Sequence, residues 1–216
     1  MKHFIFATLF TLFSLFGNAQ ATMIGTPIDE GTTNCYPFGC ASGEGSYQQL
    51  YFAESFERDS NFIGLDLFIA PHSLGAASNW LSSGEFTITL SLFSQDLLPS
   101  YGTRGFNEKT VFKGQLPTAH RGGVYRINFD KMYYNDSANV NNLLLSIHWT
   151  GANASDDPIH FVKGAGTWSQ MIKDGQVVSS EQYGLVTRLV EVPEPASLGL
   201  IALGMLGLGA TRRRTK

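Results

Sequence analysis

Two aspartates and a histidine lie close together in one polar stretch of the chain, where they could bind a metal ion. Asp156 and Asp157 precede His160 in a segment that also holds Gly and Asn residues. Carboxylate oxygens combined with backbone carbonyls are the ligands that Ca²⁺ prefers. An aspartate before a proline, as in Asp157-Pro158, is also an ordinary start of a turn, and this is the interpretation we favour. The sequence therefore predicts no metal site.

Paired carboxylates are a second chemistry that the composition allows. A glycoside hydrolase needs two of them facing each other, and the candidates lie on separate segments, namely Glu54, Glu57, Asp66 and Glu85. The chain has no G-x-S-x-G elbow, H-E-x-x-H motif, phosphate-binding loop or EF-hand loop. We therefore predict no catalytic residue and no cofactor, and a secreted polysaccharide hydrolase is the last of three hypotheses.

Cys35 and Cys40 are the only cysteines in the sequence. In an oxidising compartment they form a disulfide by default, which would close a small loop over Tyr36-Pro37-Phe38-Gly39. A metal or redox pair is the alternative, but no second Cys pair and no nearby His completes a tetrahedral site. We expect a disulfide that stabilises the fold modestly, since the loop is short, and that pins the N-terminal segment.

Aromatic residues outside the clearest strand patterns are candidates for binding sugars. They are Trp80 and Tyr101, in the connections 71–83 and 97–108, and Trp168. An aromatic ring can stack on the apolar face of a sugar while neighbouring polar groups bond its hydroxyls. Core packing of each ring is the alternative and the more frequent outcome. A carbohydrate-binding module is our second hypothesis.

These candidates have to be positioned by β-strands, because the chain between its two ends has no helix-length amphipathic segment. Apolar and small polar residues alternate strictly from Phe86 to Leu92, which predicts a strand with one buried face. Short strands separated by Gly, Asn, Asp and Pro predict an all-β fold, an antiparallel jelly-roll-like (Greek-key) β-sandwich. The predicted strands are Tyr47–Phe56, Asn61–Ala70, Gly84–Ser94, Lys109–Leu116, Gly123–Phe129, Asn142–Trp149, Ile159–Lys163, Trp168–Lys173 and Gly184–Glu191.

The N-terminal residues 1–21 have the pattern of a secretory signal peptide. Lys2 provides the positive start, a Phe- and Leu-rich run follows, and Ala19 and Ala21 match the small-residue requirement of signal peptidase. A permanent membrane anchor is the alternative, but the apolar run is short for a span. We predict cleavage after Ala21, which leaves residues 22–191 as the exported domain and 192–216 as a C-terminal segment.

The C-terminal segment combines three features. Pro193-Glu194-Pro195 holds the backbone extended, residues 196–210 are apolar and uncharged, and Arg212, Arg213 and Arg214 lie in the basic tail 211–216. A helix of the apolar residues is about 22 Å long, shorter than the roughly 30 Å of a bilayer core. The arginines would stay on the cytoplasmic side, so the Pro-Glu-Pro motif would lie at the outer face.

Together these three features resemble a PEP-CTERM protein-sorting signal, which usually accompanies an N-terminal export peptide. The resemblance implies that an exosortase, a membrane enzyme, recognises the motif, removes the tail and directs the protein to the surface or extracellular matrix of a Gram-negative, exopolysaccharide-producing bacterium. The body also resembles β-sandwich exodomains that precede such signals. That resemblance is carried by Asn34-Cys35-Tyr36-Pro37-Phe38-Gly39-Cys40, Tyr47-Gln48-Gln49-Leu50-Tyr51 and Gly184-Leu185-Val186-Thr187-Arg188.

The charge of the exported part argues against nucleic-acid binding. Residues 22–192 contain 10 Lys and Arg against 17 Asp and Glu, a formal charge of −7. Phosphate contacts need a clustered positive surface, which this part lacks. Our first hypothesis is therefore a non-enzymatic surface or matrix protein associated with exopolysaccharide, with signal peptidase and an exosortase as processing partners.

Overall fold

The computed structural model describes residues 23–27, 33–56, 60–70, 81–99, 102–117, 123–134, 141–154 and 160–192. Residues Ala21–Glu191 form a compact unit. The predicted signal peptide and the C-terminal features from Pro193 onward lie outside the described residues.

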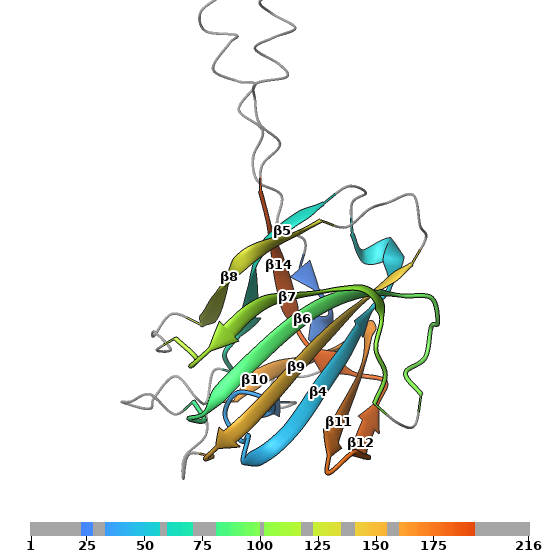
Figure 1. The fold of residues 1–216 in the computed structure, drawn as a ribbon. Helices are drawn as coiled ribbons and strands as arrows, with labels where there is room; N and C mark the ends of the chain where they lie inside the picture. The colour runs from blue at the N-terminus through green and yellow to red at the C-terminus, as the bar shows by residue number, and fades with distance from the viewer. Residues whose placement is uncertain are drawn as a thin grey trace, which may run out of the picture. The chain divides into compact units, whose positions relative to one another are not determined.

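One antiparallel sheet of six strands forms the larger layer of the structure (Figure 1). Its strands, in spatial order, are β12 (Gln176–Glu181), β11 (Thr167–Lys173), β4 (Gly43–Tyr51), β9 (Asn142–Ala152), β6 (Glu85–Phe93) and β7 (Phe106–Gly114). A single 3₁₀ turn, η1 (Ala53–Ser55), follows β4 and is the only helical element among the described residues.

Shorter sheets make up the opposing layer. One has the order β1 (Met23–Ile24), β14 (Thr187–Glu191), β5 (Asn61–Phe68) and β8 (Val124–Tyr134). The other joins β13 (Gly184–Leu185), β10 (Phe161–Ala165) and β2 (Thr26–Pro27), and β3 (Thr33–Asn34) also pairs with β10. An antiparallel bridge from Ile69 to Phe161 connects these two groups of strands.

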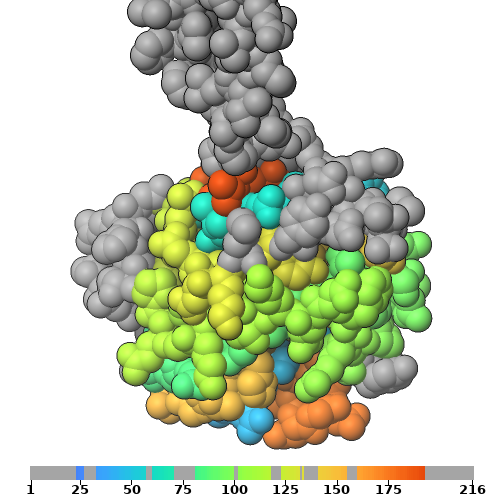
Figure 2. All heavy atoms as spheres, turned by 45° about the horizontal axis from the view of Figure 1, so that its top comes forward, coloured from blue at the N-terminus to red at the C-terminus, as the bar shows by residue number. Residues whose placement is uncertain are grey.

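The chain passes between the layers repeatedly. The connections β4 to β5, β5 to β6, β7 to β8 and β8 to β9 all change sheet, whereas β6 and β7 pair directly with each other. Crossings of this kind are what Greek-key connections produce in sandwiches. The predicted all-β, antiparallel sandwich is confirmed. Figure 2 shows β7 and β8 next to each other on the surface, where the two layers meet.

The core lies between the two layers and follows the alternation of the strands. Phe86, Ile88 and Leu90 of β6 are fully buried, whereas Thr87 and Thr89 between them are only half-buried. The alternation predicted for Phe86–Leu92 is thus present from Phe86 to Leu90, whereas Ser91 is buried as well as Leu92. The facing layer contributes buried apolar residues from three strands: Leu65, Leu67, Ile127 and Leu189.

Polar side chains on the inner face of β4 join the two layers. Gln49 accepts a hydrogen bond from the Leu185 N–H at 2.8 Å and donates one to the Leu185 carbonyl at 2.9 Å. Tyr47 donates its hydroxyl to Gln49 Oε1 at 2.6 Å, and Thr187 donates to the Tyr51 hydroxyl at 3.0 Å. Two of the segments quoted for the exodomain resemblance are therefore in direct contact.

A carboxylate on the other side of the smaller layer bonds two arginines. Asp66 of β5 is opposite Arg126 of β8 and Arg188 of β14, and each arginine donates to it at 2.5–2.9 Å. Burial favours the neutral carboxyl, but the two guanidinium groups outweigh this effect and hold the pKa of Asp66 below its ordinary value. Asp66 is therefore a fixed negative charge that cross-links three strands.

Some strand boundaries differ from the prediction. β4 begins at Gly43 and ends at Tyr51, because the chain turns into η1 where the predicted strand continues to Phe56. The short strands β1, β2 and β3 occur within the predicted polar lead-in. Strand β12 was not predicted, although Asp174-Gly175 is a hairpin signal, and both residues have the positive φ of 52° and 74° that such a turn uses.

The first testable prediction concerns the contact between Gln49 and Leu185. Gln49→Ala leaves the buried N–H and carbonyl of Leu185 without their partners, so we expect it to lower the free energy of unfolding by about 2–4 kcal/mol. Tyr47→Phe removes one hydroxyl and should lower it by about 1 kcal/mol. Urea denaturation measures both, with Gln176→Ala on exposed β12 as control. A Gln49→Ala protein as stable as this control would contradict the inter-layer role.

The second prediction concerns Asp66. Asp66→Asn should lower the free energy of unfolding by about 1–3 kcal/mol at pH 7, because the charged hydrogen bonds to both arginines are weakened. The carboxyl of the unfolded chain titrates near 3.8 and that of the folded chain lower. The stabilisation is therefore complete above the unfolded pKa and is lost as pH falls through the folded pKa.

Thermal unfolding between pH 7 and pH 2 tests this prediction. The difference in stability between wild type and Asp66→Asn should shrink toward zero at the acidic end. Asp174→Asn is the matched control, because Asp174 is exposed and asparagine tolerates its positive φ. A difference that stays constant with pH would show that the loss comes from packing and not from the charge.

Candidate functional site

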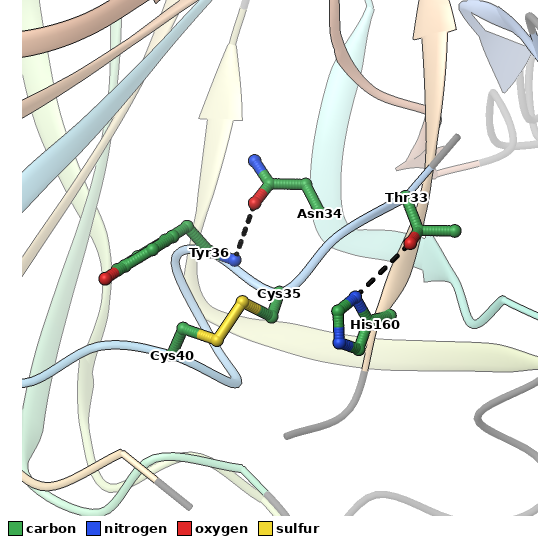
Figure 3. Close-up of a disulfide and its surroundings, with 6 residues drawn as sticks. All are labelled: Thr33, Asn34, Cys35, Tyr36, Cys40 and His160. Carbon is green, nitrogen blue, oxygen red and sulfur yellow. Dashed lines mark hydrogen bonds between the residues drawn. A yellow bond between two sulfur atoms is a disulfide. The ribbon is translucent and has the colours of Figure 1, made fainter. Parts of the chain in front are cut away.

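The predicted disulfide is present and closes a tight loop. Cys35 and Cys40 are bonded, with their Cα atoms 5.3 Å apart. Gly39 and Cys40 both donate their N–H to the Cys35 carbonyl, at 2.6 and 3.2 Å. Asn34 caps the loop from the other side by accepting the N–H of Tyr36 at 3.0 Å, and the Tyr36 ring extends away from the disulfide (Figure 3). The prediction that Cys35 and Cys40 pair is confirmed.

Phe38, at the centre of this loop, is fully buried in the core. Its ring lies 5.9–6.2 Å from the rings of Phe86, Tyr125 and Phe161, which belong to both layers. Its carbonyl also accepts the N–H of Ser82 at 2.7 Å. The loop thus pins the N-terminal segment, as expected, and it does so through aromatic packing as well as through the covalent bond.

A polar pocket of about 280 Å³ opens beside the disulfide loop. Asn34 and Tyr36 form one wall, Lys163 of β10 another, and Ser179 and Glu181 of β12 a third. The wall formed by Asn34 and Tyr36 is held in place by pairing of β3 with β10. A hydrogen bond between the Thr33 hydroxyl and His160 Nδ1 at 3.3 Å also holds it (Figure 3). The pocket is therefore assembled from segments far apart in the sequence.

Charges of both signs lie in this pocket. Lys163 forms an ion pair with Glu181, and its side chain is 16 % exposed against 41 % for Glu181. Burial lowers the pKa of Lys163. The ammonium group also lies 5.8 Å from the centre of the Tyr183 ring, a cation–π distance. The pair presents one donor and one acceptor group with no net charge.

The sequence does not single out this pocket. Asn34 and Tyr36 belong to the segment that carries the family resemblance, and Tyr36 also to the predicted disulfide loop, but no sequence motif indicates Lys163 or Glu181. Lys163 and Glu181 are 18 residues apart and belong to no linear motif. The nearest signal is the Asp174-Gly175 turn, which predicts that β12 folds back beside β11.

Of the three aromatic residues predicted to bind sugars, the structure describes Trp168. Trp168 is half-buried and packs against a small apolar cluster on the outer face of the six-stranded sheet, formed by Leu50, Phe93, Leu98 and Leu144. The β6–β7 connection supplies Leu98 to this cluster, and Thr103 bonds Gln48 there through both its N–H and its carbonyl. Trp80 and Tyr101 lie outside the described residues.

The candidate carboxylates that the structure describes have different surroundings. Asp66 bonds two arginines, Glu85 lies 3.2 Å from the Lys113 ammonium, and Glu54 is exposed on η1. Glu57, Asp156 and Asp157 lie outside the described residues. Within the part of the chain that the structure describes, no three His, Cys, Asp or Glu residues are grouped so that they could hold a metal ion.

The residues proposed for processing and membrane orientation lie beyond the described part. They are Ala19, Ala21, Pro193, Glu194, Pro195, Arg212, Arg213 and Arg214. Among the described residues, no helix is both long and apolar enough to cross a membrane. The apolar segment 196–210, predicted as a short helix, lies outside the described residues.

Comparison with known proteins identifies the C-terminal segment. Residues 191–214 match the family model of the PEP-CTERM protein-sorting motif. No curated protein and no solved structure matches the chain. The match begins at Glu191, the last residue of β14, and covers the Pro-Glu-Pro motif, the apolar run and all three arginines. The chain therefore carries a PEP-CTERM sorting motif and is a secreted protein, transiently anchored in the membrane and sorted by an exosortase.

Proposed function

We propose that the exported sandwich is a non-enzymatic structural or adhesive protein, associated with exopolysaccharide at the cell surface or in the extracellular matrix of a Gram-negative bacterium. Signal peptidase removes residues 1–21, and the exosortase removes the tail. The observation that carries this proposal is the sorting motif itself, because it directs the folded part of the chain out of the cell.

The boundary between the sandwich and the motif supports processing without damage to the fold. β14 ends at Glu191, and the Pro-Glu-Pro sequence starts two residues later. Proline lacks a backbone N–H, so this sequence cannot continue the ladder of β14. Cleavage there removes no strand residue, and the exported domain keeps the contacts that stabilise it.

The described side chains support a structural role in a second way. Asp66 is held ionised by Arg126 and Arg188, which makes it a poor proton donor. Glu85 pairs with Lys113 on the neighbouring strand. Both carboxylates thus take part in cross-strand contacts, and this supports the proposal of a structural role.

The third prediction tests the sorting step. Replacing Pro193, Glu194 and Pro195 together by alanine should abolish tail removal, because the extended, helix-breaking substrate is lost. In the native host, wild type should appear outside the membrane without its tail, and the variant should stay in the membrane fraction with its tail intact. Cell fractionation and intact mass spectrometry measure both properties.

Ser197→Ala is the control for this experiment, since it changes one residue of the apolar run and leaves the motif unaltered. It should be processed like wild type. Equal tail retention and equal distribution of wild type and the triple-alanine variant would overturn the proposed route. The same mass spectra report cleavage after Ala21 and the Cys35–Cys40 disulfide.

A further inference from the structure

We propose that the pocket beside the disulfide loop, hereafter the loop pocket, binds one neutral sugar ring of an extracellular glycan. It is lined by Asn34, Tyr36, Tyr47, Lys163, Ser179 and Glu181. This inference rests on the proposed function, since it supplies the contact between the exported domain and its polysaccharide. It assigns that contact to residues other than Trp80, Tyr101 and Trp168.

The size of the loop pocket limits the ligand. Its volume of about 280 Å³ is below the roughly 300–1,000 Å³ of pockets that hold drug-sized molecules. A single pyranose ring fits this scale. The pocket is also partly open to solvent, so a ring can enter while the rest of the glycan stays outside.

The charges of the loop pocket favour a neutral ligand rich in hydroxyls. Glu181 would repel an anionic ligand, and Lys163 would repel a cationic ligand. Because these two side chains are paired with each other, neither is a net charge for an ionic ligand to neutralise. A hydroxyl both donates and accepts, so adjacent sugar hydroxyls can accept from the ammonium of Lys163 and donate to the carboxylate of Glu181.

An aromatic ring supplies the apolar contact that a sugar needs. Tyr36 lines the loop pocket and is half-buried, and its ring lies 6.5 Å from that of the buried Trp149, tilted by 31°. Trp149 supports the inner side of Tyr36. The disulfide and the hydrogen bond from the Tyr36 N–H to Asn34 hold the backbone beneath it. Such a preorganised ring loses little conformational entropy on binding.

No described residue that lines the loop pocket belongs to β14, the strand that leads to the sorting motif. The turn between β11 and β12 lies at one end of the sandwich, and the Glu191 end of β14 lies at the other (Figure 1). Processing at the sorting motif and binding of a glycan therefore involve different parts of the domain, and one can be altered without the other.

The fourth prediction fills the loop pocket and measures sugar binding. Ser179 lines it, with its hydroxyl 3.4 Å from Glu181, whereas Ser180 is exposed and not part of the lining. Ser179→Trp should weaken binding by at least about tenfold because the indole occupies the sugar position. Ser180→Trp, the same change on the other face of β12, should bind like wild type. Ser179→Leu is a milder filling variant in case the indole disturbs the strand.

Binding is measured by NMR titration of the full-length protein in a detergent without a sugar headgroup. The probes are the methyl glycosides of glucose, galactose, mannose and N-acetylglucosamine, with glucuronate and glutamate as charged comparators. The expected result is saturable binding of at least one neutral glycoside, lost in both Ser179 variants. Soluble polysaccharide and lipopolysaccharide vesicles of the host then distinguish a free glycan from a lipid-linked one.

Three results would overturn the assignment: none of the neutral glycosides binds, binding persists unchanged in folded Ser179→Trp and Ser179→Leu, or only the charged comparators bind. Each variant's thermal unfolding and its NMR spectrum establish that it is folded. These outcomes are separate from failure of the proposed function, because sorting is measured in cells with the Pro193-Glu194-Pro195 variant and does not depend on Ser179.

Discussion

The fold depends on the hydrogen bonds that three inward-facing polar residues of β4 form with the opposing layer. Tyr47, Gln49 and Tyr51 point between the layers, where an unbonded polar group would be strongly destabilising. The side-chain amide of Gln49 bonds both the N–H and the carbonyl of Leu185, as the backbone of a neighbouring strand would. Thr187 donates its hydroxyl to that of Tyr51. These bonds determine which part of β13 and β14 lies over β4. Apolar packing alone would allow the layers to slide more freely.

Two further contacts close the structure around this junction. On the inside, Phe38 fills the space between the layers at the disulfide loop and touches aromatic rings from both. On the other face of the smaller layer, Asp66 links β5, β8 and β14 through two arginines. Since β14 is the last strand before the sorting motif, these contacts hold in place the strand from which that motif continues.

The same arrangement explains why a polar pocket is tolerated next to the core. β3 and the disulfide loop form one side of the loop pocket, and the β11–β12 hairpin forms another. Neither side depends on the pocket being filled, because each is held by backbone pairing or by a covalent bond. Tyr47 lines the loop pocket and donates its hydroxyl to Gln49, so the pocket borders the junction between the layers.

Local patterns in the sequence determined most of the longer strands, the disulfide and the sorting motif. The alternation of apolar and polar residues in β6 predicts which of its faces is buried. With only two cysteines in the chain, each has one possible partner. The C-terminal features are contiguous in the sequence, so they can be recognised without knowledge of the fold. Patterns of this kind involve residues close together in the chain. The physical cause of such a pattern, for example the burial of every second side chain of a strand, involves residues of a single segment. It can therefore be recognised in the sequence of that segment.

Only the tertiary structure decided which distant residues meet. Asp66 bonds Arg126 and Arg188, and Trp168 packs against an apolar cluster to which the β6–β7 connection contributes Leu98; neither set of neighbours follows from a local sequence pattern. Lys163 and Glu181 show no pattern in sequence. Their pairing arises from the order of strands in the sheets, which is set by non-local packing and hydrogen bonding, and no segment of the chain contains that information by itself.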